Sequence, residues 1–361
     1  MKLVEKIDAF SKLGNYLRNL KSNDLNALSD DQVKEILVDE NHVSDFLEAQ
    51  EKLVDFYAYS NHHNAWFTQD FVLKALSSWS ISLTTENLSA WLNLYELEEE
   101  SKEKTIGVVM AGNLPLVGFH DYLSILMTSN KLMAKLSSND AVMLPILHQM
   151  LVSIESRFAN KAEFTQAQLK NFDAVIATGS DNTSRYFDYY FGKYPHIIRR
   201  NRSGVAILTG QETKSDLKNL GKDIFTYYGL GCRSVSKLYV PANYDFKEFF
   251  IILEEYKHIG NHHKYFNNYE YNKAIYLVNK EMHRDTGFLL LKEDTNLSSP
   301  ISVMYYEEYT EESQLKKELD TRKSEIQCII GKAYIPFGDS QEPNLNDYAD
   351  GVDTVNFLSQ L

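Results

Sequence analysis

Short apolar runs alternate with helical stretches from residue 106 onward, and this alternation constrains the fold more than any other feature of the chain. Residues 106–110, 132–134 and 174–177 are expected to be strands, and residues 119–127, 140–158 and 182–191 to be helices. Strands that alternate with helices form parallel sheets with both faces covered. The chain is therefore expected to have an α/β fold.

A second block of the same kind follows the basic turn at residues 199–204. Its expected strands are 205–208, 237–240, 274–278, 301–306 and 326–330, and its expected helices are 215–228, 246–257 and 311–323. Residues 3–100 instead place apolar side chains at helical spacing, which predicts a helical layer. The charged run at 98–104 indicates a boundary between this layer and the first α/β block.

Composition excludes several classes of protein. The 37 Lys and Arg against 50 Asp and Glu give a net charge of −13, which disfavours nucleic acid as a general partner. Two cysteines cannot build a disulfide framework or a cysteine-based zinc site. The longest apolar stretch, 106–119, contains Asn113 and Pro115 and is too short for a bilayer, and residues 1–14 lack a secretory core. We expect a cytoplasmic protein with no membrane span.

Small polar residues follow three of the expected strands, where parallel sheets bind their ligands. They are Asn113 after the first, Lys135, Ser137 and Ser138 after the second, and Thr178, Gly179 and Ser180 after the third. The last three can offer N–H groups and hydroxyls to an anion, although an ordinary polar turn is equally compatible with them. A P-loop and the G-x-G-x-x-G dinucleotide fingerprint are both absent from the sequence.

Cys232 ends the run Gly229-Leu230-Gly231-Cys232, in which two glycines allow a ligand to approach the backbone. A cation at Arg233 favours the reactive thiolate if its side chain points toward the sulfur. The alternative is that Cys232 is a small buried hydrophobic residue, the commoner state of a lone cysteine. Cys328 lies within an apolar strand and is expected to belong to the core.

Two further clusters are weaker candidates. His258, His262 and His263 lack a carboxylate at ligand spacing, so no metal site is expected. Arg199, Arg200 and Arg202 stand between the two α/β blocks of an acidic protein. They are either a solvated turn or a patch for a polyanionic substrate such as a coenzyme A thioester.

Taken in order, residues 107–115 (GVVMAGNLP), 129–137 (SNKLMAKLS), 177–180 (ATGS), 229–232 (GLGC) and 336–338 (PFG) resemble the aldehyde dehydrogenase superfamily. With the helical front third, they look most like its acyl-CoA reductase (LuxC-type) branch. The resemblance implies an aldehyde dehydrogenase-like fold with a helical region over 1–100 and a Rossmann-like cofactor-binding domain over 101–203. A catalytic thiol domain over 204–335 and a segment over 336–361 that returns to the cofactor domain would complete it.

The resemblance also implies roles for individual residues. Cys232 matches the nucleophile, and Asn113 matches the asparagine whose amide forms an oxyanion hole with the backbone N–H of that cysteine. Lys135 matches the lysine that reaches the adenosine ribose, with Ser137 and Ser138 beside it. Thr178, Gly179 and Ser180 match the loop beside the phosphates of a nicotinamide cofactor.

Three departures from the family pattern sharpen the expected chemistry. The glutamate that activates water in hydrolytic dehydrogenases aligns near Arg199, and residues 195–211 contain no carboxylate. Without that base an acyl-enzyme should exchange with coenzyme A and not with water. Ser138 replaces a glutamate that would repel a 2′-phosphate, so NADPH is expected, with NADH as the alternative. The glutamate that usually contacts ribose is unmatched before Pro300, which leaves that contact open.

We therefore expect an oxidoreductase that reduces a fatty acyl-CoA to the aldehyde through a thioacyl-cysteine. The alternatives are an acyl-phosphate or acyl-protein reductase of the same superfamily, and a catalytically silent scaffold. The expected partners are the acyl-CoA substrate, a second copy of the chain, and an enzyme that donates the acyl group or consumes the aldehyde.

Overall fold

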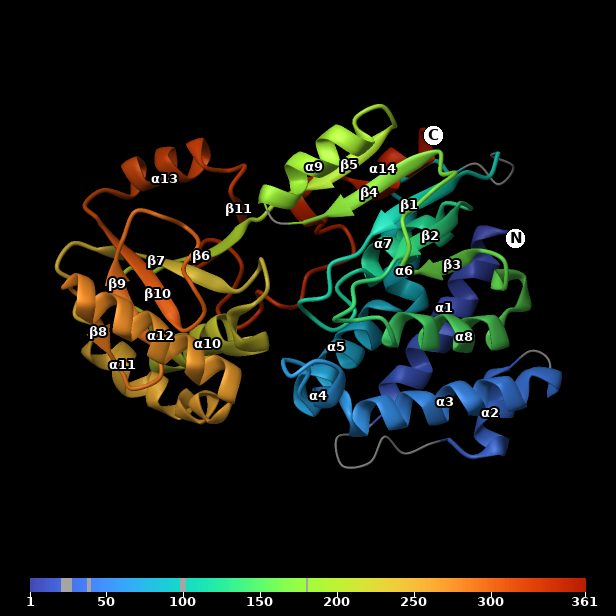
Figure 1. Ribbon diagram of the computed structural model, residues 1–361, viewed down its shortest axis with the longest axis horizontal. Coiled ribbons are helices and arrows are strands. Elements are labelled where there is room, and N and C mark those ends of the chain that lie inside the picture. The colour runs from blue at the N-terminus through green and yellow to red at the C-terminus, as the bar shows by residue number, and fades with distance from the viewer. Residues whose placement is uncertain (21–27, 38–39, 98–101, 180) are drawn as a thin grey trace. The chain divides into compact units, whose positions relative to one another are not determined.

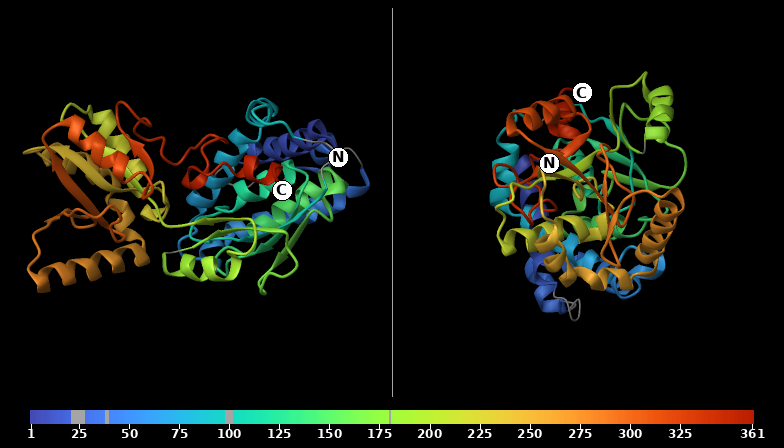
Figure 2. Two further views of the ribbon diagram at one scale, coloured as in Figure 1. Left: turned by 90° about the horizontal axis from the view of Figure 1, so that it is seen from above. Right: turned by 90° about the vertical axis from the view of Figure 1, so that its left-hand side faces the viewer.

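The computed structural model describes residues 1–20, 28–37, 40–97, 102–179 and 181–361. They form two compact units, a first unit of Met1–Arg200 with Asn344–Leu361 and a second unit of Asn201–Pro343 (Figure 1). Both ends of the chain belong to the first unit (Figure 2). In the described part of the chain, no helix is long and apolar enough to cross a membrane.

The first unit combines a helical layer with a five-stranded sheet. Its helices are α1 (Leu3–Asn19), α2 (Asp30–Ile36), η1 (Glu40–His42), α3 (Val43–Ala58), α4 (Ser60–His63), α5 (Gln69–Ser82), α6 (Thr85–Leu92), α7 (Phe119–Met127), α8 (Met143–Ile154), η2 (Ser156–Phe158), α9 (Asp181–Phe191), η5 (Ala349–Gly351) and α14 (Thr354–Ser359). Its strands are β1 (Thr105–Val109), β2 (Lys131–Lys135), β3 (Ala162–Thr165), β4 (Ala174–Thr178) and β5 (His196–Arg199).

The strands of this sheet are parallel and run in the order β3-β2-β1-β4-β5. The chain winds outward from β1 in one direction through β2 and β3, and then in the other through β4 and β5. The direction reverses between β1 and β4, where doubly wound sheets open a crevice at the carboxyl ends of their strands. The carboxyl edge of this sheet is therefore the candidate ligand-binding edge, even though the sequence lacks the glycine fingerprint.

The helical layer and the sheet share one hydrophobic core, so the two parts of the first unit are not independent. α1 packs against α5 and α8, and α3 also packs against α8. The ring of Phe10 on α1 meets the rings of Tyr122 and Phe158 edge-on. The returning segment adds Val355 and Leu358 to the same core, and its Tyr348 hydroxyl accepts a hydrogen bond from Trp91 Nε1 at 2.7 Å.

The second unit contains a six-stranded sheet in the order β11-β6-β7-β10-β9-β8, parallel except for the β8–β9 pair. Its strands are β6 (Ser203–Ile207), β7 (Val235–Pro241), β8 (Arg284–Asp285), β9 (Leu290–Glu293), β10 (Val303–Tyr309) and β11 (Ile326–Ile330). Its helices are α10 (Lys214–Phe225), η3 (Thr226–Gly229), α11 (Lys247–Leu253), η4 (Glu254–Asn261), α12 (His263–Asn279) and α13 (Glu312–Thr321).

One expected strand is wrong. Residues 274–278 belong to α12, which the sequence analysis missed entirely. The buried face of this helix is Tyr265, Tyr269, Asn272 and Tyr276, spaced four, three and four residues apart. Among the apolar residues that suggested a strand, Tyr276 is buried, whereas Leu277 is 61% and Val278 80% exposed. The apolar run therefore passes from the buried to the exposed face of one helix and does not form a strand.

Candidate functional site

The residues expected to bind a cofactor lie at the carboxyl edge of the first sheet. Lys135 and Thr178 are the last residues of β2 and β4, and both are half-buried. Val109, the last residue of β1, pairs with Lys135 on one side and Ala177 on the other, so the three strands end level with one another. Asn113 is exposed in the loop that follows β1. Ser180 lies outside the described residues.

Two loops at this edge are joined to each other. A Cβ atom on Gly112 would lie 2.5 Å from Cβ and Oγ of Ser137, so only glycine allows the two backbones to approach this closely. The backbone N–H of Leu116 donates to Oδ2 of Asp140 at 3.0 Å. Burial raises the pKa of Asp140 to about 6. The loop that carries Asn113 is therefore held against the loop that carries Ser137 and Ser138.

The three arginines have different surroundings. Arg199 is 6% exposed and its guanidinium donates to both carboxylate oxygens of Asp121, at 2.6 and 2.7 Å, and to the Thr354 hydroxyl at 3.1 Å. These contacts assign Arg199 a structural role, so we do not retain it as a substrate-binding residue. Arg200 is exposed and lies 3.2 Å from a carboxylate oxygen of Asp188. Arg202 is half-buried in the second unit.

Cys232 is exposed and follows an unusual turn. Tyr227, Tyr228 and Gly229 have φ values of 55°, 56° and 75°, so three consecutive residues are left-handed. For a residue other than glycine this conformation costs roughly 1–2 kcal/mol. The ring centroids of Tyr228 and His262 are 4.2 Å apart. His262 also caps α12, because its Nδ1 accepts the Tyr265 N–H. Burial of the two tyrosines holds the strained turn that presents the thiol.

The residues directly after Cys232 are held by three other parts of the second unit. Arg233 Nε donates to the Ser340 carbonyl at 2.6 Å, and the Arg233 carbonyl lies 3.6 Å from Sγ of buried Cys328. A Cβ atom on Gly204 would lie 2.7 Å from the carbonyl oxygens of both Arg233 and Ser234. The two residues that follow Cys232 therefore pack directly on the backbone of β6 at Gly204. Arg233 was considered above as a partner for the Cys232 thiolate; its Nε–H is hydrogen-bonded to the Ser340 carbonyl.

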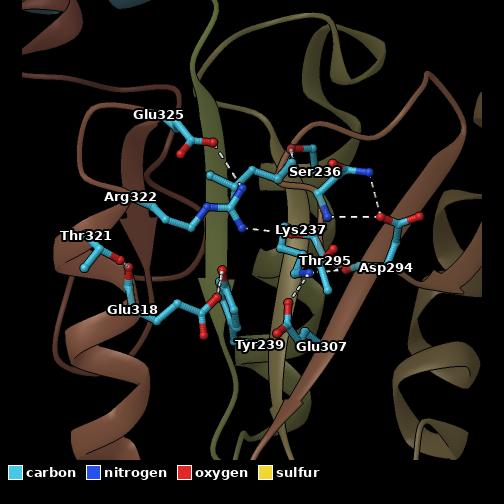
Figure 3. Close-up of polar contacts among 12 residues, drawn as sticks. Ser236, Lys237, Tyr239, Asp294, Thr295, Glu307, Glu318, Thr321, Arg322 and Glu325 are labelled. Atoms are coloured by element: carbon cyan, nitrogen blue, oxygen red, sulfur yellow. Dashed lines mark hydrogen bonds and ion pairs between the residues drawn. The ribbon is translucent and has the colours of Figure 1, made fainter.

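A separate charged cluster crosses the sheet of the second unit (Figure 3). Lys237 on β7 has a fully buried side chain, whose ammonium donates to Oε2 of Glu307 at 2.8 Å and to the carbonyl of Asp294. Arg322 donates to the Thr295 carbonyl at 2.8 Å and to Glu325 at 3.1 Å. Burial lowers the pKa of Lys237, and Glu307 opposes that shift. The cluster joins β7, β10, α13 and the chain after β9, and every described contact in it is structural.

The structure adds residues that the sequence analysis did not select. Asp140 joins the two loops of the first sheet, and Tyr227 and Tyr228 form the left-handed turn. Asp223 on α10 is fully buried and accepts hydrogen bonds from the backbone of residues 338 and 340. A signal for Asp223 existed, because a carboxylate stands among Leu217, Leu220 and Ile224 on the apolar face of its helix. The left-handed tyrosines had no such signal.

Comparison with known proteins agrees with this architecture. Residues 98–258, which include both Asn113 and Cys232, match the model of the family described as Acyl-CoA reductase (LuxC). No curated protein sequence matches the chain.

Solved aldehyde dehydrogenases have the same fold. Aldehyde dehydrogenase 21 from Physcomitrella patens, in complex with succinate, is 12% identical with a TM-score of 0.57, over 92% of this chain and 74% of that one. An aldehyde dehydrogenase from Bacillus cereus with bound NAD+ is 13% identical with a TM-score of 0.54, over 91% and 72%. The P. syringae indole-3-acetaldehyde dehydrogenase AldA with bound NAD+ is 10% identical with a TM-score of 0.56, over 88% and 69%.

At these identities the solved structures establish the fold, while the family match supports oxidoreductase chemistry on an aldehyde or acyl group. The expected α/β class with a helical front region is confirmed. The resemblance drawn from the short motifs is confirmed as well. The chain has the aldehyde dehydrogenase fold, and its residues 98–258 match the acyl-CoA reductase (LuxC) family model.

Proposed function

We propose that this protein reduces a fatty acyl-CoA thioester to the aldehyde with NADPH, through a thioester on Cys232. The observation that carries the proposal is the exposed Cys232 behind a strained turn, in a segment that matches the acyl-CoA reductase family. Backbone strain held by buried side chains is typical of functional sites. A thiol that served only to fill the core would be buried, as Cys328 is.

The nicotinamide cofactor fits the carboxyl edge of the first sheet. A doubly wound sheet binds dinucleotides beside the strand at which its order reverses, and Thr178 ends that strand, β4. A Cβ atom on Gly179 would lie 2.8 Å from the Phe187 ring, so glycine allows α9 to pack closely on the end of β4. Lys135, Ser137, Ser138, Thr178, Gly179 and Ser180 are the residues that we propose hold the cofactor. NADPH is favoured over NADH because Ser138 places no carboxylate beside a 2′-phosphate.

The reaction that we propose begins at the sulfur. The Cys232 thiolate attacks the thioester carbonyl, and the Asn113 amide and the Cys232 backbone N–H donate to the oxygen as it becomes negative. The carbon–sulfur bond to coenzyme A breaks, the coenzyme A thiolate leaves and takes up a proton, and the acyl group remains on Cys232 as a thioester. When bound, the cofactor supplies the hydride that reduces this thioester. The resulting thiohemiacetal loses the Cys232 thiolate and releases the aldehyde.

Substrate binding in this proposal uses Arg200 and Arg202, because coenzyme A carries phosphates that arginine recognises well. Asn113 and Arg200 belong to the first unit, whereas Cys232 and Arg202 belong to the second. Their joint action is therefore part of the proposal. A homo-oligomer, a partner enzyme that donates acyl groups or consumes aldehyde, and a cytoplasmic location remain predictions from the sequence.

The test combines two measurements on the purified full chain. NADPH oxidation is followed by absorbance with acyl-CoA esters of increasing chain length, for the wild type and for Cys232→Ala. Intact mass is then measured after incubation with acyl-CoA alone. We expect oxidation with at least one ester, its loss in Cys232→Ala, and a stoichiometric acyl adduct on the wild type only. Undiminished oxidation in Cys232→Ala contradicts the mechanism.

The same experiment separates the alternatives. A faster reaction with an acyl phosphate or an acylated carrier protein than with any acyl-CoA would identify a related reductase with a different acyl donor. Absence of any adduct with all three donors would favour the silent scaffold. An adduct that forms without NADPH oxidation would retain the thiol chemistry and remove the reductase.

A further inference from the structure

We propose that Asp223 is a positioning residue for Cys232, which it controls through the loop of residues 336–341 and the side chain of Arg233. The inference rests on the proposed role of Cys232 as the nucleophile. It concerns residues of the second unit alone, so every contact in it lies within one compact unit.

The first link joins α10 to the loop. Asp223 is fully buried, and its two carboxylate oxygens accept separate backbone hydrogen bonds, from Gly338 N–H at 2.7 Å and Ser340 N–H at 3.0 Å. Gly338 has φ of 100°, a backbone conformation open mainly to glycine. One carboxylate therefore fixes two peptide groups of a tightly turned loop.

The second link joins the loop to the nucleophile segment. The Ser340 carbonyl accepts the Arg233 Nε–H at 2.6 Å, and Gln341 Nε2 donates to the Ser234 hydroxyl at 3.1 Å. Arg233 shares a peptide bond with Cys232. The loop thus holds the two residues that follow the thiol in the chain, whereas the strained turn at residues 227–229 precedes it.

A merely stabilising role explains these contacts poorly. Burial raises the pKa of Asp223, because a carboxylate loses hydration that its hydrogen bonds only partly replace. An apolar residue on the core face of α10 would avoid that cost, but it could not bind two backbone N–H groups and so set the loop. Holding a reacting group in place is worth such a cost, because a misplacement of about 1 Å can slow a reaction roughly 100-fold.

The test compares Asp223→Asn, Arg233→Met and the double variant in the full chain. Asn keeps the size of the side chain but turns an N–H₂ group toward one of the two N–H donors. We expect kcat for acyl-CoA reduction to fall about tenfold or more, with KM for NADPH changed less than about threefold. We expect the double variant to lose no more than the worse single variant, because both act through one linkage.

A second readout does not depend on acyl-CoA. The rate at which iodoacetamide alkylates Cys232 is measured by peptide mapping across pH 6–10, and each of the three variants should shift the rate or its pH profile. Glu307→Gln is the matched control, since it disturbs another buried charge of the same unit and should lower stability without altering alkylation of Cys232. If Asp223→Asn does not fold, Arg233→Met, whose side chain is only half-buried, tests the same linkage.

The outcomes distinguish this inference from the function on which it rests. Wild-type kcat and alkylation in folded Asp223→Asn, or in Arg233→Met, overturn the positioning role and leave the reductase intact. Equal effects on alkylation from Glu307→Gln and Asp223→Asn overturn it as well, because they would reflect general destabilisation. A wild-type protein that reduces no acyl donor removes the proposed function, whereas the alkylation result still decides whether Asp223 positions the thiol.

Discussion

Arg199 and Asp121 form a bidentate ion pair, 2.6 and 2.7 Å between the paired atoms, at the end of β5 in the first unit. Both side chains are less than a tenth exposed. In the resemblance drawn from the sequence, the general base of hydrolytic aldehyde dehydrogenases aligns near Arg199. The residue there holds the fold together and offers no carboxylate to activate water.

Two neighbouring arginines can be compared directly. Arg199→Met should lower the free energy of unfolding by about 3–5 kcal/mol, because it leaves Asp121 as a buried, uncompensated charge. Arg200→Met should change stability by less than about 1 kcal/mol, since its partner Asp188 is solvent-exposed, but should raise KM for acyl-CoA. Urea denaturation and steady-state kinetics measure the two effects. If Arg199→Met kept wild-type stability and raised KM for acyl-CoA, Arg199 would be a substrate-binding residue and not a structural one.

The ion pair between the buried Lys237 and the half-buried Glu307 gives a further stability prediction. Glu307→Gln should cost about 3 kcal/mol, because the Lys237 ammonium stays buried and loses its charged partner. Lys237→Met with Glu307→Gln should recover much of that loss, since no buried charge remains. Denaturant midpoints of the two singles and the double measure the coupling. If the losses in unfolding free energy of the two single variants simply add in the double variant, Lys237 and Glu307 are not energetically coupled.

Asp140 should make stability depend on pH. Its pKa rises from 3.8 to about 6 in the folded protein, so its contribution is fully present below pH 3.8 and is lost as pH rises through 6. The loss amounts to about 3 kcal/mol. Asp140→Asn removes this titration, so its stability relative to wild type should increase between pH 4 and pH 7. Urea midpoints of both proteins at several pH values provide the measurement, and a constant difference would contradict the prediction.

Gly204→Ala should displace the segment that carries Cys232, the proposed nucleophile. The new methyl group would meet the carbonyl oxygens of Arg233 and Ser234 at 2.7 Å, a contact that neither backbone can accommodate without moving. We expect at least about a tenfold loss of kcat in a protein that still folds. Gly210→Ala is a useful control, because its nearest contact is 3.9 Å and its left-handed backbone tests strain alone. Circular dichroism and kcat should separate the two variants.

Ser138→Glu tests the cofactor. A carboxylate at this exposed position should repel a 2′-phosphate and raise KM for NADPH at least about tenfold, with little change for NADH. Ser138→Gln, which is similar in size and uncharged, is the control. An unchanged ratio of the two KM values would remove Ser138 from the cofactor site.

The sequence predicted the parts of the fold that have strong local signals. The runs at 106–110 and 174–177 correspond to β1 and β4, because strands buried on both faces are nearly continuous apolar runs. The run at 326–330 corresponds to β11, an edge strand in which buried and half-buried residues alternate. β3 and β5 were missed because they are short and lie at the edges of the sheet, where polar residues are tolerated. α12 was mistaken for a strand because its last turn places the exposed Leu277 and Val278 directly after the buried Tyr276, which gives a continuous apolar run.

The candidate site divides in the same way. Short motifs suggested Asn113, Lys135, Thr178 and Cys232 as candidate site residues, since glycine and small polar residues at the ends of expected strands are visible locally. The contacts of Asp223 with residues 338 and 340 join parts of the chain more than a hundred residues apart, and no local pattern encodes them. Arg199 was expected in a solvated turn or in a substrate-binding patch, because its buried partner Asp121 is distant in sequence and no local pattern joins them.

Because residues 344–361 return to the first unit, the two units can complete their folding in a fixed order as the chain leaves the ribosome. The second unit is one continuous segment and can close its core as soon as residue 343 has emerged. The first unit must wait longer, because Leu345, Val355 and Leu358 belong to its core. A nascent chain can therefore hold a folded second unit, which contains Cys232, while the first unit is still incomplete. Truncation within the final 18 residues should accordingly impair folding of the first unit, although most of that unit is synthesised first.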